Sequence, residues 1–91
     1  MSRLSLAIVP KINALFRLQW EPAQNTHVLL YPEGMVQLNG PASEILTRID
    51  GNSTIEAIIQ QLQAAFPEAP DLADDVTAFL EEAHEHNWIS L

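Results

Sequence analysis

The 91-residue chain contains no cysteine, few glycines and few basic side chains. The absence of cysteine excludes disulfides, thiolate nucleophiles and cysteine metal sites, and it is consistent with a reducing compartment. No apolar stretch approaches the roughly 20 residues that a membrane-spanning helix needs. We therefore expect a cytoplasmic protein without a membrane partner.

The few basic residues are unevenly placed. The formal net charge is −8, and residues 41–91 carry ten acidic side chains against Arg48 alone. Residues 1–40 carry three basic side chains and two acidic ones. A phosphate backbone is repelled by an acidic surface, so nucleic acid is a poor partner for this chain.

The length suits one domain. A chain of this size buries roughly 60–65% of its unfolded surface, which gives a real but thin core. Residues 1–14 contain a short apolar run followed by Pro10 and Lys11, without the cleavage pattern of a signal peptide. We interpret residues 1–14 as an N-terminal arm and residues 15–91 as a single domain.

Three segments near the start of this domain have the pattern of strands. "LFRLQWE", residues 15–21, alternates apolar and polar side chains, and "HVLLY" and "MVQL" follow at 27–31 and 35–38. "PEG" at 32–34 predicts a tight turn, because Pro32 fixes φ and Gly34 tolerates positive φ. The three segments predict a small antiparallel meander.

Helical spacing begins after residue 39. Asn39 or Gly40 is expected to cap a helix with Pro41 in its first turn, and Gly51 is placed to end it. Ser53 and Glu56 match a capping box for a second helix, which Pro67 would end. Asp71 is expected to cap a third helix. One face of that helix is expected to comprise Leu72, Val76, Phe79, Leu80, Ala83 and Asn87. The order predicts an α+β fold, a small three-stranded antiparallel sheet followed by three helices, with a winged-helix-like topology.

No arrangement of residues predicts catalysis or a cofactor. The chain shows no Ser–His, Cys–His or paired-carboxylate motif and no Gly-rich phosphate loop. Glu82 and His86 are spaced i, i+4, but two ligands from one turn do not define a metal site. We expect neither an enzyme nor a bound metal or cofactor. Duplex DNA is also excluded, because the third helix is acidic and has no Lys or Arg.

The strand at 35–38 carries neither Lys nor Pro, the residues that commonly protect an exposed sheet edge. Two interpretations follow. An extended peptide could add to this edge as a further strand. Alternatively, the arm segment "LSLAIV" could cover the edge, within one chain or by exchange between two chains.

Residues 9–91 resemble the PqqD family of pyrroloquinoline quinone (PQQ) biosynthesis. The resemblance rests on "LQWE", "LLYPEGMVQLN", the "A.EIL…DG" pattern, "IDGNSTIEAII", "FLEEAHEHNWI" and the Trp near the C-terminus. It covers most of the chain but includes no catalytic motif, since the family has none.

The resemblance implies a peptide chaperone. The family binds the precursor peptide PqqA and presents it to the radical S-adenosylmethionine enzyme PqqE, which cross-links a Glu and a Tyr in that peptide. In related recognition domains of other peptide-modifying pathways, the leader peptide is held as an added strand between the third strand and the third helix. Carried onto this chain, the strand side comprises Met35, Val36, Gln37, Leu38 and Asn39. Periodicity selects the helix side as Val76, Phe79, Leu80 and Ala83. The alternative is a structural or dimerising domain without a peptide-binding role, with the N-terminal arm as a route to a homodimer.

Overall fold

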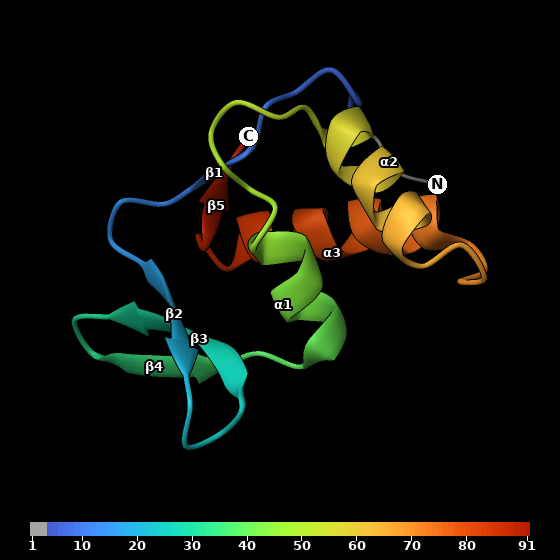
Figure 1. Cartoon of the computed structure of the whole chain (residues 1–91). Coiled ribbons are helices and arrows are strands. Elements are labelled where there is room, and N and C mark those ends of the chain that lie inside the picture. Colours follow the sequence, from blue (N-terminus) through green and yellow to red (C-terminus); the bar gives the residue numbers. More distant parts are fainter. Residues whose placement is uncertain (1–3) are drawn as a thin grey trace.

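The computed structural model describes residues 4–91 and confirms the predicted α+β fold (Figure 1). The strands are β1 (Lys11–Ile12), β2 (Arg17–Glu21), β3 (Thr26–Tyr31), β4 (Gly34–Gln37) and β5 (Ile89–Ser90). The helices are α1 (Gly40–Leu46), α2 (Ile55–Ala65) and α3 (Leu72–Glu85). Within residues 4–91, no helix has the length and apolar character needed to cross a membrane.

β2, β3 and β4 form the predicted antiparallel meander, with β3 in the centre. Pro32 and Glu33 form the turn between β3 and β4, since Tyr31 pairs with Gly34. β2 begins at Arg17, two residues later than the alternating pattern predicted, because Asn13 stabilises a turn before it. Its side-chain Oδ1 accepts the N–H of Leu15 at 3.0 Å, and its carbonyl accepts the N–H of Phe16 at 2.9 Å.

α1 begins as predicted but ends early. The side chain of Asn39 accepts the N–H of Ala42 at 2.8 Å, which caps the helix. The prediction that Gly51 ends this helix is wrong, because the last helical residue is Leu46. Gly51, at φ +80°, instead lies in a loop that the carboxylate of Asp50 stabilises. The carboxylate accepts N–H groups from Asn52 and Ser53, each at 2.8 Å, and these bonds lower the pKa of Asp50.

The first turns of α2 and α3 also differ in detail from the prediction. Thr54, not Ser53, caps α2, since its side chain accepts the N–H of Ala57 at 3.1 Å. Asp71 precedes α3 as predicted, but it adopts a left-handed conformation and its side chain makes no capping bond. The acidic first turn of α3 still lies at the positive end of the helix dipole.

The predicted arm, from Leu4 onward, packs against the helical part of the domain. The carbonyls of Leu6 and Ile8 accept the N–H groups of Glu56 and Ile55 at the start of α2. β1 pairs with β5 at the other end of the chain. The described part of the arm therefore does not cover β4 within the chain. Residues 1–3 lie outside the described residues, and the division into residues 1–14 and 15–91 stays a prediction.

One hydrophobic core joins the sheet to the helices. Leu29 and Leu38 supply its sheet side, and Val36 and Leu18 pack against it in part. Every helix contributes, and Ile49 is buried although it lies beyond the end of α1. The face of the sheet that carries Leu18, Leu29, Val36 and Leu38 is called the inner face below.

Candidate functional site

The outer edge of β4 is open in the described chain, since β3 is its only hydrogen-bonded neighbour there. Leu38 donates its N–H to the carbonyl of His27 at 3.3 Å, which fixes the alternation of the ladder. Val36 and Gly34 therefore direct their backbone groups toward β3. Met35 and Gln37 direct their N–H and C=O groups outward, where a further strand can pair with them.

The side chains of β4 alternate in the opposite sense. Val36 is half-buried and Leu38 is 5% exposed, both on the inner face. Met35 and Gln37 are exposed on the other face. Asn39 follows β4 and is committed to capping α1, with its carbonyl accepting the N–H of Ser43. Of the five predicted strand residues, Met35 and Gln37 therefore offer the free backbone groups.

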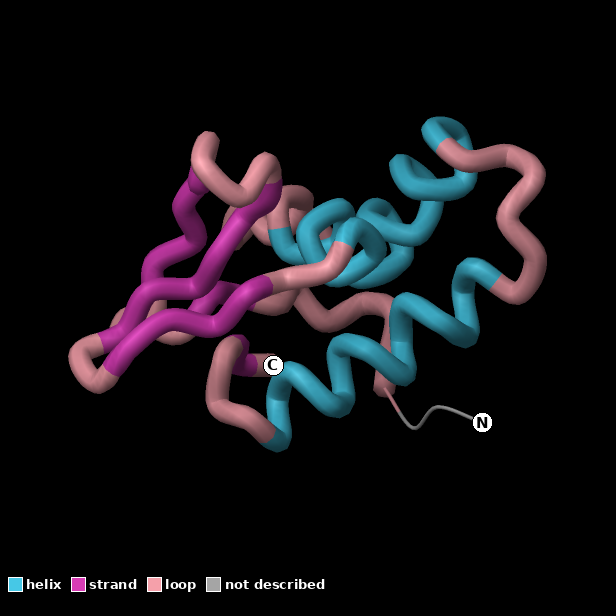
Figure 2. The backbone as a smooth tube through the Cα atoms, turned by 90° about the horizontal axis from the view of Figure 1, so that it is seen from below, coloured by secondary structure: helices cyan, strands magenta, loops and turns pink. Residues whose placement is uncertain are grey.

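Three of the four predicted helix residues belong to the buried core, and the fourth, Phe79, packs against it, as Val36 of β4 does. Val76, Leu80 and Ala83 are fully buried, whereas Phe79 is partly exposed. The view from below shows β4 on the side of the sheet that lies nearest α3, and β2 on the far side (Figure 2). Of these four side chains, Phe79 is thus the one that remains partly accessible on α3.

Trp88 follows α3 and is not among the predicted site residues. Its side chain is partly exposed, packs against the core and stacks on His86 with ring centroids 4.9 Å apart. Its backbone joins the end of α3 to the arm, because its carbonyl accepts the N–H of Asn13 at 2.9 Å.

The titratable side chains of α3 are arranged as a solvated face. His86 Nε2 lies 3.8 Å from Glu82 Oε1, and both side chains are more than half exposed. Within residues 4–91, no three His or acidic side chains come together in a way that could hold a metal ion.

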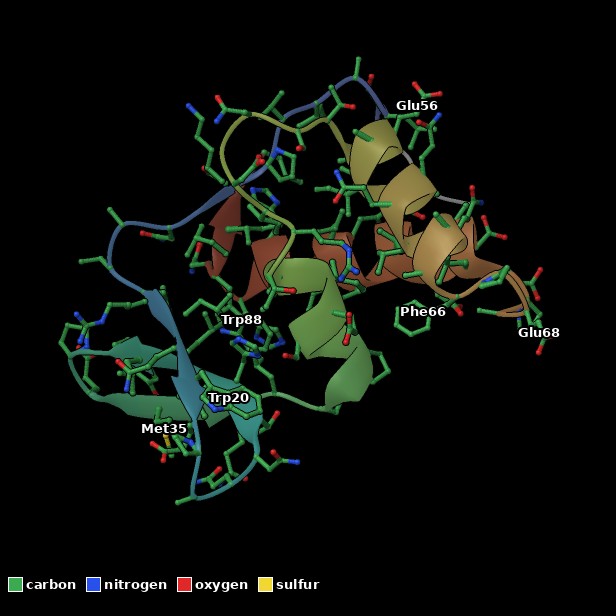
Figure 3. All side chains as sticks on the ribbon, in the orientation of Figure 1. Trp20, Met35, Glu56, Phe66, Glu68 and Trp88 are labelled. Atoms are coloured by element: carbon green, nitrogen blue, oxygen red, sulfur yellow. The ribbon has the colours of Figure 1, made fainter. Side chains whose placement is uncertain are left out.

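A pocket of about 470 Å³ lies away from β4, between the start of α1, the end of α2 and the start of α3. Figure 3 shows Phe66, which lines it, at the opposite end of the molecule from Met35. Its lining comprises Gly40, Pro41, Glu44, Ile45, Leu62, Phe66, Ala69, Leu72 and Asp75. None of the predicted site residues is among them, so this pocket is separate from the β4 edge.

Comparison with protein families gives a match over residues 26–89 to the model of coenzyme PQQ synthesis protein D (PqqD). The chain is 54% identical to the PqqA binding protein of Stutzerimonas stutzeri, over its whole length and 99% of the relative. It is 52% identical to the PqqA binding protein of Azotobacter vinelandii, with the same coverage.

A solved structure has the same fold. The solution NMR structure of the PqqD truncation of Methylobacterium extorquens PqqCD matches with a TM-score of 0.79. The match covers 99% of this chain and 97% of the other, at 26% sequence identity. That protein is described as a functional and stand-alone recognition element for ribosomally synthesized and post-translationally modified peptides.

Proposed function

This chain belongs to the PqqD family, and we propose that it binds the precursor peptide PqqA as an added strand on the outer edge of β4. The open backbone of Met35 and Gln37 is the observation that carries the proposal. The names of its relatives, the PqqA binding proteins, support the choice of peptide.

Backbone pairing alone would give weak binding. Met35 and Gln37 offer two N–H and two C=O groups, which at ~0.5–1.5 kcal/mol per bond stabilise the complex by a few kcal/mol. Micromolar affinity needs about 8 kcal/mol. Side-chain contacts must therefore supply the remainder, and we assign them to the exposed Met35 and to the accessible parts of Val36 and Phe79.

The buried helix residues have a different part in this proposal. Val76, Leu80 and Ala83 fix α3 in the core shared with the sheet, and Phe79 packs against that core. The exposed face of α3 is acidic, with Glu82 and Glu85 in its last turns. A basic side chain of the peptide would gain from these charges, mostly in its rate of association.

We propose further that the chain is not an enzyme and that it works in the cytoplasm, where it presents PqqA to the radical S-adenosylmethionine enzyme PqqE. A strand added at an edge leaves one side of its backbone and half of its side chains accessible. The peptide could therefore be held by this chain and still be reached by a second protein. No metal or cofactor takes part on this chain in the proposal.

Titration of the ¹⁵N-labelled protein with PqqA peptide tests the site. Amide shifts should gather on residues 35–39 and on one face of residues 72–87. Shifts gathered on β2 or α2 instead would show binding at another site. Absence of any shift at saturating peptide would favour the alternative function, a structural or dimerising domain.

Duplex DNA provides a matched negative test, because the topology is winged-helix-like. The helix in the recognition position, α3, carries acidic side chains and no Lys or Arg. DNA binding should be absent at physiological salt. Submicromolar binding in a gel-shift experiment would contradict this interpretation of α3.

A further inference from the structure

An exposed aromatic residue, Phe66, ends α2 at the end of the molecule away from β4. Phe66 is 42% exposed. Its N–H donates to the carbonyl of Leu62 at 2.8 Å, and its carbonyl accepts the N–H of Ala69 at 3.1 Å. Both backbone groups are therefore held, which fixes the place from which the aromatic side chain leaves the chain.

Phe66 stands between two neighbouring hollows. The first is the pocket of about 470 Å³ described above, whose wall is mostly apolar and includes Leu62 and Leu72. The second, of about 490 Å³, also reaches Phe66 and Leu72, and its wall includes Asp71 and Asp74. Figure 3 shows the Phe66 side chain beside α1 and the end of α2. Phe66 and the two hollows are together called the Phe66 surface below.

The charged groups of the Phe66 surface are all acidic. Glu44 and Asp75 line the first hollow, Asp71 and Asp74 line the second, and no described Lys, Arg or His lines either one. Within residues 4–91, Arg48 pairs with Glu44 at 2.8 Å, whereas none of the three aspartates has an ion-pair partner. A basic side chain of another molecule would therefore meet carboxylates that this chain leaves unneutralised.

We propose that the Phe66 surface docks a partner polypeptide that carries an apolar side chain next to a Lys or Arg side chain. The apolar side chain enters the first hollow, and the basic side chain passes over Phe66 to Asp71 and Asp74. The stem of Lys or Arg packs on apolar surface while its charge stays in water, and a cation over an aromatic ring gains further attraction. Charge complementarity selects this occupant, because an acidic polypeptide is repelled and an uncharged apolar ligand fills only the first hollow.

The Phe66 surface is independent of the proposed PqqA site. A single exposed aromatic residue is ordinary on a protein surface, but here an apolar hollow and unpaired carboxylates adjoin it. Met35 and Phe66 lie at opposite ends of the molecule (Figure 3), so both sites can be occupied at once. The inference therefore stands whether or not PqqA adds to β4.

The tripeptide acetyl-Lys-Leu-Lys-amide is a minimal probe of this chemistry. Titrated into the ¹⁵N-labelled protein, it should shift amides of the residues that line the two hollows, with the millimolar affinity expected of so small a ligand. Acetyl-Glu-Leu-Glu-amide has the opposite charge, and acetyl-Lys-Ser-Lys-amide lacks the apolar group. Each should bind about tenfold more weakly. Saturation with PqqA should leave the affinity for the probe unchanged.

Two variants locate the probe. Phe66→Ala removes exposed aromatic surface and should weaken probe binding about tenfold. The double variant Asp71→Asn, Asp74→Asn removes two charges from the second hollow and should weaken binding about fivefold. Asparagine tolerates the left-handed conformation of Asp71, at φ +54°, so the start of α3 keeps its form.

Each variant has a matched control. Leu15→Ala truncates a side chain that is 68% exposed and lies before β2, and the double variant Glu21→Gln, Glu33→Gln removes two charges from the sheet. Both controls should bind the probe as the native chain does, and amide spectra establish that every variant folds.

Three outcomes would overturn the proposal. The first is that the probe shifts no amide of the two hollows. The second is that acetyl-Glu-Leu-Glu-amide binds as tightly as the probe, or that Phe66→Ala binds the probe as tightly as Leu15→Ala does. The third is displacement of the probe by PqqA, since the Phe66 surface would then belong to the peptide site.

Discussion

The two edges of the central sheet differ in what lies beside them and in what their side chains offer. β4 lies on the side of α3, and its exposed residues, Met35 and Gln37, carry no charge (Figure 2). β2 lies on the far side, and its outer face carries Arg17 and Glu21. Charged side chains on an edge strand oppose unselective pairing, whereas an edge without charge accepts an added strand more readily. The comparison therefore favours β4 over β2 as the edge for peptide addition.

Among these substitutions, Leu29→Ala should lower the free energy of unfolding most, because β3 pairs with both edge strands. Leu29 is fully buried in the core and pairs with both Leu18 and Val36. We expect a loss of about 2–5 kcal/mol in the free energy of unfolding. Urea denaturation measures it, with the half-buried Leu30→Ala as the control on the other face. Equal losses for the two variants would show that the core does not depend on the inner face.

The pair Leu80→Ala and Phe79→Ala separates support of the β4 edge from contact with a peptide. Leu80 is fully buried, so its truncation should cost about 2–5 kcal/mol of stability. Phe79 is partly exposed and should give a mixed result, with a smaller loss of stability and a clear loss of PqqA affinity. Denaturation and peptide titration of both variants measure the two effects. A Phe79→Ala protein that binds normally would remove Phe79 from the proposed site.

Proline substitution sharpens the difference between the inward and outward residues of β4. Val36→Pro and Leu38→Pro remove an N–H that pairs with β3 and should cost about 1–3 kcal/mol or more for the unpaired carbonyl of β3. Met35→Pro and Gln37→Pro remove an outward N–H, so PqqA affinity should fall more than stability. The same titration and denaturation measurements apply. Peptide affinity that is unchanged in Gln37→Pro would contradict strand addition at this edge.

Asn39→Ala should have the smallest effect of these substitutions on stability. Loss of the cap on α1 should cost about 1 kcal/mol. Asn39→Ser is the control, because serine can also accept the N–H of Ala42. If both variants bind PqqA as the native chain does, Asn39 contributes only as a cap, and the site ends at Leu38. Thermal denaturation together with peptide titration distinguishes the two roles.

Much of the fold could be predicted because the signals are local. Alternation identified β2, β3 and β4, and the Asn39 cap marked the start of α1 within one residue. The helix-ending role assigned to Gly51 was wrong for a physical reason. Ile49 lies four residues after Ile45 and is buried, as a residue of the helix would be, but it reaches the core from a turn after the helix has ended at Leu46.

Local sequence patterns predicted the candidate site less completely than the fold. Periodicity correctly placed Val76, Leu80 and Ala83 on the core face of α3, but it did not separate these fully buried side chains from the partly exposed Phe79. Alternation likewise assigns faces to β4, yet it does not say which residues direct their backbone outward. That depends on the register with β3, which a single hydrogen bond from Leu38 to His27 reveals.

The sequence by itself determined the elements, the acidic character of α3 and the pattern of charges on β2, because each depends on neighbours along the chain. Only the tertiary structure decided that the arm pairs with Ile89–Ser90, that β4 lies on the side of α3 and that Met35 and Gln37 point outward. These features join residues far apart in the sequence. They are stabilised by burial and by pairing between distant segments. Neither interaction produces a periodic pattern within one segment of the sequence.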